Sequence, residues 1–95
     1  MSNVMNMFKS TIGDLTPGTE QNEYYQNFIN QAKSYLLAED IDENILLDTE
    51  LGMFALVAHA EALMQKRDIA GDSTLLLLRN KLSAQTKGKR YDDES

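Results

Sequence analysis

The stretch from Ile45 to Arg67, ILLDTELGMFALVAHAEALMQKR, constrains the fold more than any other part of the chain. Within residues 51–64, Glu61 is the only certainly charged residue. A surface helix carries an apolar stripe, whereas a helix that is apolar nearly all round is buried among other elements. Asp48 and Glu50 interrupt the apolar run, which is also too short for a membrane span. We therefore predict a central helix, with the other elements packed around it.

One broad apolar face of this central helix is expected to comprise Leu47, Leu51, Phe54, Ala58 and Leu63. Five further residues widen it to most of the circumference: Met53, Leu56, Val57, Ala60 and Met64. Gly52 weakens a helix locally, so the helix is either kinked or begins as a separate short piece. Two capping positions fit these alternatives. Asp42 is one, with Ile41 and Leu46 as a flanking apolar pair, and Asp48 or Thr49 is the other.

Apolar residues elsewhere also recur with helical spacing, and no segment shows sustained alternation. The second segment, for example, has its apolar face at Tyr24, Tyr25, Phe28, Ile29, Ala32, Tyr35 and Leu36. We predict an all-α bundle of about four helices, near residues 3–12, 20–38, 43–67 and 73–84. Gly13 is expected to end the first helix in the left-handed conformation, and Thr16-Pro17-Gly18 to form a tight turn. The predicted domain covers residues 1–84, followed by a flexible charged tail at residues 85–95.

Composition argues against catalysis. The chain of 95 residues has no cysteine and a single histidine, His59. His59 has no second histidine or cysteine with which to bind zinc, and no acid–base partner at a suitable spacing, so we interpret it as a partly buried packing or interface residue. We expect no enzymatic activity, no metal and no cofactor. The net charge of −6 disfavours sequence-specific nucleic-acid binding. The N-terminus lacks signal-peptide features, so we expect a cytoplasmic protein that does not enter a membrane.

Charge is distributed unevenly along the chain. Residues 1–72 carry twelve acids and four bases, whereas residues 73–90 carry five bases and no acid. The simplest interpretation is solvation and dipole complementarity at the end of a helix. The alternative is a docking segment for an acidic surface. Under that alternative the candidate partner-binding residues are Leu76, Arg79, Lys81, Lys87, Lys89, Arg90 and Tyr91.

Four consecutive leucines, Leu75 to Leu78, begin the last predicted helix. They cannot all face one core, so in a monomer one or two of them are expected to be exposed. Exposed leucines that merge into a patch mark a contact surface. A dense packing site between three helices is the alternative.

Three segments carry a family resemblance: FINQAKSYL in the second predicted helix, FALVAHAEALMQKRD in the central one, and the Gly-Asp-Ser loop before the last. Over Phe8 to Leu82 the chain resembles the head–tail connector (adaptor) proteins of tailed bacteriophages. The resemblance implies a structural subunit of a ring in the virion neck. Its implied partners are the portal, the next tail-completion protein and sister subunits, and residues 79–91 take the position that reaches the portal.

A different class of protein also fits the sequence. A small cytoplasmic helical regulator would bind one partner helix or peptide in an apolar groove. Under this hypothesis the leucines of residues 75–82 form the groove, and the protein is a monomer or dimer. The size of the assembled protein distinguishes the two hypotheses.

Overall fold

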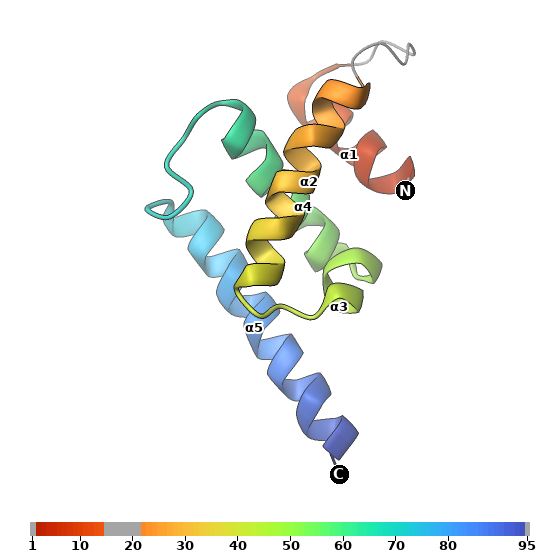
Figure 1. Cartoon of the computed structure of the whole chain (residues 1–95), viewed down its shortest axis with the longest axis vertical. Coiled ribbons are helices and arrows are strands. Elements are labelled where there is room, and N and C mark those ends of the chain that lie inside the picture. Colours follow the sequence, from red (N-terminus) through yellow and green to blue (C-terminus); the bar gives the residue numbers. More distant parts are fainter. Residues whose placement is uncertain (1, 15–21, 95) are drawn as a thin grey trace.

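The computed structural model describes residues 2–14 and 22–94, with side chains for residues 4–14 and 22–89. The described part is all-α and contains five helices: α1 (Ser2–Ile12), α2 (Asn22–Ala38), α3 (Glu43–Asp48), α4 (Glu50–Met64) and α5 (Ser73–Glu94). Figure 1 shows α4 in the middle, behind α2, with α1 and α3 on one side and α5 on the other. The fold class is therefore the one predicted. The expected turn at residues 16–18 lies outside the described residues.

Helix α4 is the centre of the bundle and packs against all four other helices. Its inward positions hold small or medium side chains, namely Gly52, Ala55, Leu56, Val57, His59, Ala60 and Ala62. Small residues allow the neighbouring helices to approach closely, and the apolar side chains that are buried supply most of the favourable free energy of folding. The prediction that the central element is the most buried is confirmed.

The core face predicted for this helix is only partly right. Phe54 is 55% exposed, and Leu51, Ala58 and Leu63 are half-buried. Four surrounding helices leave α4 a narrow exposed strip, and Phe54 lies on it beside Glu50. Tyr24 on α2, which the periodicity also assigned to the core face, is 50% exposed.

The predicted central helix of residues 43–67 is two helices. Asp42 caps α3, because its carboxylate accepts hydrogen bonds from the backbone N–H groups of Asn44 and Ile45 at 2.9 and 3.2 Å. Thr49 then caps α4, because its hydroxyl oxygen accepts from the Gly52 N–H at 3.0 Å. Both capping positions are used, and the break between α3 and α4 confirms that the first turn is a separate piece. The second helix of the pair ends at Met64.

Helix α1 covers one end of α2. The Phe8 ring packs on Tyr25 at 5.3 Å between ring centroids, and the Tyr25 hydroxyl donates to Asp14 at 2.6 Å. That hydrogen bond to a carboxylate raises the pKa of Tyr25 above its ordinary value. Gly13 ends α1 with a φ of 82°, so the predicted left-handed end is confirmed.

Candidate functional site: the outer face of the last helix

Helix α5 contains the candidate partner-binding residues, and Asp72 fixes where it begins. The Asp72 carboxylate accepts hydrogen bonds from the N–H groups of Thr74 and Leu75 at 2.9 and 3.1 Å. The helix points the four leucines to different sides. Leu75 and Leu78 are buried in the core, whereas Leu76 and Leu77 are 46% and 54% exposed. The prediction that one or two of the leucines remain exposed is confirmed.

Arg79 does not lie on the exposed side of α5. It is only 8% exposed, and its guanidinium donates to the Tyr35 hydroxyl on α2 and to the Ile69 carbonyl oxygen, the latter at 3.1 Å. The guanidinium carbon also lies 5.3 Å from the centroid of the Tyr35 ring, within range of a cation–π interaction. Arg79 therefore joins α5, α2 and the loop before α5. This internal role is different from the partner-binding role predicted for it.

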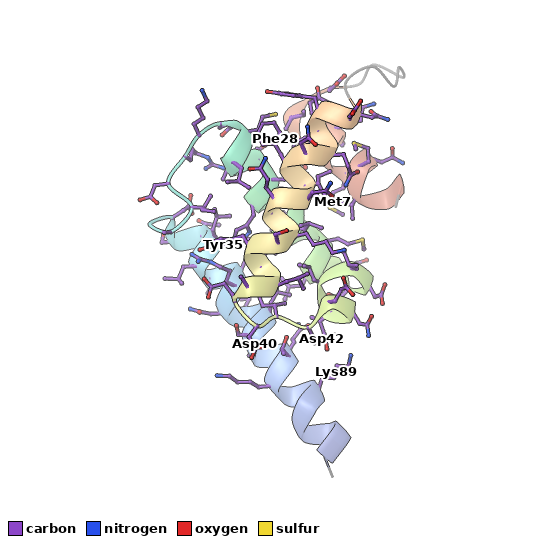
Figure 2. All side chains as sticks on the ribbon, viewed as in Figure 1. Met7, Phe28, Tyr35, Asp40, Asp42 and Lys89 are labelled. Atoms are coloured by element: carbon purple, nitrogen blue, oxygen red, sulfur yellow. The ribbon has the colours of Figure 1, made fainter. Side chains whose placement is uncertain are left out.

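The distal part of α5 also contacts the body of the protein. Thr86 is buried, and its hydroxyl oxygen accepts a hydrogen bond from the Asp42 N–H at 3.0 Å. Lys89 forms an ion pair with the Asp42 carboxylate at 3.1 Å, and Figure 2 shows these two side chains at the junction of the α2–α3 connector with α5. The hydrogen bond from Lys89 is the main cause of an Asp42 pKa below its ordinary value. We call these three residues, Asp42, Thr86 and Lys89, the α5 latch.

Three of the remaining candidates, Leu76, Lys81 and Lys87, lie on the opposite side of the helix, which we call the outer face of α5. It comprises seven exposed residues, Leu76, Leu77, Asn80, Lys81, Ala84, Lys87 and Gly88. Lys81 and Lys87 form no ion pair with any described residue, and residues 73–89 contain no acid. The outer face thus combines an apolar pair with uncompensated positive charge. The side chains of Arg90 and Tyr91 are outside the described set.

The second candidate surface is a groove that the sequence analysis did not identify. It has a volume of about 360 Å³ and is lined by residues of four helices, Val4, Gln26, Ile29, Asn30, Lys33, Leu47, Asp48 and Leu56. Its apolar floor includes the buried Ile29 and Leu56, and its rim is polar. Periodicity assigns residues to helix faces but does not show where two helices diverge, so no sequence signal pointed to this groove. Of the leucines that the sequence suggested for a groove, Leu75, Leu78 and Leu82 are in the core, and Leu76 and Leu77 are exposed.

His59 is fully buried next to Tyr35, with 5.9 Å between ring centroids. Its Nδ1 lies 2.7 Å from the Ala55 carbonyl oxygen, which can only accept, so the neutral ring carries its proton on Nδ1. Burial lowers the pKa of His59, and the charge of Arg79 contributes in the same direction. Nε2 has no described partner. Among the described residues, no three His, Cys, Asp or Glu side chains gather where they could share a metal ion.

None of the helices in the described ranges combines the length and the apolar character needed to cross a membrane. No family model, curated protein or solved structure matches the chain.

Proposed function

We propose that this protein is a non-enzymatic structural subunit that assembles through its last helix, as a head–tail connector (adaptor) of a tailed bacteriophage. One observation carries the proposal: the outer face of α5 presents Leu76 and Leu77 beside Lys81 and Lys87 with no acid between them. Exposed apolar residues next to uncompensated charge are typical of a surface that a partner covers.

The shape of the molecule supports an assembly role. The protein measures 47 × 28 × 17 Å along its principal axes, and Figure 1 shows the C-terminal end of α5 projecting from the bundle. A projecting helix can reach a neighbouring subunit or a portal while the body keeps its fold. The implied partners are the portal, the next tail-completion protein and sister subunits in a ring, and the implied location is the neck of the virion.

The groove favours a second candidate function, that of a helical module that binds a peptide or a partner helix. Its volume lies within the range of about 300–1,000 Å³ that is common for ligand pockets. A module of this kind functions as a monomer or dimer, whereas a connector functions as a closed ring. The number of subunits in the assembled state therefore separates the two functions.

Light scattering after size-exclusion chromatography, followed by electron microscopy of any large species, tests the proposal. We expect a closed ring of subunits, formed either at high protein concentration or on addition of a portal ring. A second preparation carrying Leu76→Ser and Leu77→Ser should keep its helical circular dichroism and lose assembly, because neither side chain is in the core. A wild-type protein that stays monomeric or dimeric in both settings would overturn the connector proposal in favour of the peptide-binding module.

A further inference from the structure

We infer that the groove lined by α1, α2, α3 and α4 receives the outer face of α5 from a second copy of this chain. The inference rests on the proposed function, since it concerns the contact that would join neighbouring subunits. It identifies the two surfaces and the residues at which they meet. Apolar fit, charge and the positions of the two surfaces on one molecule support this pairing.

The apolar parts of the two surfaces suit each other. Inside the groove, Ile29 and Leu56 form a floor, and the side walls include Val4 and Leu47. The outer face of α5 offers Leu76 and Leu77, which are among the most exposed large apolar side chains described. Moving a leucine side chain from water to an apolar surface lowers the free energy of the system. Burial of the leucine pair in the groove is therefore favourable.

The charges on the two surfaces are complementary. Lys33 on the groove wall is already paired with Glu43, at 3.2 Å. Asp48, which also lines the groove, and the nearby Glu50 are exposed and form no ion pair with any described residue. The groove therefore has a negative edge, and the outer face of α5 brings Lys81 and Lys87. Such complementarity favours this pairing over association of two outer faces, which would bring like charges together.

The groove and the outer face belong to different sides of the molecule. In Figure 1 the helices α1 and α3 lie on one side and the N-terminal half of α5 runs along the other. No residue of α5 lines the groove. A contact between two different surfaces is head-to-tail, and repeating it closes a ring when the rotation per subunit allows it. The basic segment that the sequence suggests as a docking segment for an acidic surface is partly used within the chain, since Lys89 binds its own Asp42.

The chain contains no cysteine, so engineered cysteines report the contact directly. Asp48→Cys and Lys81→Cys variants, one of them isotopically labelled, are mixed at a concentration at which the wild type assembles, and are then mildly oxidised. We expect disulfide-linked pairs that join positions 48 and 81, at several times the yield of 48–48 or 81–81 pairs. Ser34→Cys is the matched control, because Ser34 is exposed on α2 and does not line the groove.

Charge exchange provides a second readout that does not depend on oxidation. Lys81→Glu should weaken self-association by about two- to fivefold, the range expected for one exposed ion pair, and Asp48→Lys in the partner should restore it. If the wild type assembles and position 81 links equally to positions 48 and 34, or the exchange restores nothing, the groove is not the receiving surface and the proposed function stands. If the wild type does not assemble with itself or on a portal ring, both the contact and the connector function are wrong.

Discussion

Arg79 and His59 are both buried and contact the same aromatic ring, that of Tyr35, but their polar atoms are satisfied to different degrees. Arg79 is a permanent cation, and the Tyr35 hydroxyl and the Ile69 carbonyl oxygen accept hydrogen bonds from its guanidinium. His59 has one such bond and an unpaired Nε2, and it lies close enough to Arg79 for the positive charge to oppose a second proton. The buried imidazole is therefore held in its neutral form, and folding is coupled to the proton concentration.

We expect the free energy of unfolding to decrease as pH falls from 7.5 to 5.5. In the unfolded chain His59 titrates near pH 6.5, whereas in the folded protein burial and Arg79 lower its pKa. Below about pH 6.5 the unfolded state thus binds more protons than the folded state, which favours unfolding. The stability that the neutral His59 contributes is complete only above that pH. Carboxylates titrate mostly below this window. Urea denaturation at several pH values measures the slope.

His59→Gln removes the titrating group and is the matched comparison. Its absolute stability will differ, but its dependence on pH between 7.5 and 5.5 should be nearly flat. An equally steep dependence in this variant would assign the effect to other groups and contradict the neutral, buried state of His59.

At the scale of elements, local signals were predictable from the sequence and long-range contacts were not. The caps Asp42 and Thr49 and the left-handed Gly13 could be identified because each acts within a few residues of itself. The end of the last helix was placed at residue 84, but α5 continues to Glu94. Its distal part is held by Thr86, whose partner Asp42 lies 44 residues earlier in the chain. Periodicity carries no information about a partner at that distance.

The candidate site shows the same division. The exposure of two leucines followed from the geometry of a helix, since four consecutive residues point in different directions. The inward orientation of Arg79 depended on Tyr35, again 44 residues away, and the sequence analysis placed Arg79 among the partner-binding residues. Lys81 and Lys87 are exposed as expected, and their role in binding a partner stays a prediction.

The junction of α3 and α4 leads to a prediction about two glycines. A Cβ atom on Gly52 would overlap the carbonyl oxygens of Ile45 and Leu46 and lie 2.6 Å from the Leu46 Cα, so only glycine lets the two helices meet there. Gly52→Ala should destabilise the protein by about 1–3 kcal/mol or more, as overpacking against backbone does. Chemical denaturation monitored by circular dichroism measures the change.

Gly88 provides the control, because it is also in a helix and a Cβ there meets nothing within 4 Å. Gly88→Ala should leave the fold intact and stabilise it by about 0.5–1 kcal/mol through helix propensity. Equal effects of the two substitutions would contradict the close packing of α3 on α4.

At the scale of the whole molecule, the contacts of the distal part of α5 bear on where the folded unit ends. The sequence predicts a domain that stops at residue 84, with a flexible tail at residues 85–95. The contacts place Thr86 in the buried set and join Lys89 to Asp42, so the described body extends through the α5 latch. The mobility of residues 85–95 in solution stays a prediction, and the two boundaries have different consequences for truncated proteins.

We expect a protein truncated after Lys89 to unfold at nearly the same denaturant concentration as the full chain, because it keeps the whole latch. Truncation after Gln85 removes Thr86 and Lys89, which leaves the Asp42 N–H without its acceptor and the Asp42 carboxylate without its cation. The loss of these contacts should cost about 1–3 kcal/mol. Thr86→Val in the full chain is the matched variant, because it keeps the buried volume and removes only the hydroxyl. If the protein ending at Gln85 is as stable as the full chain, the latch contributes nothing and the folded unit ends near residue 84, as the sequence alone predicts.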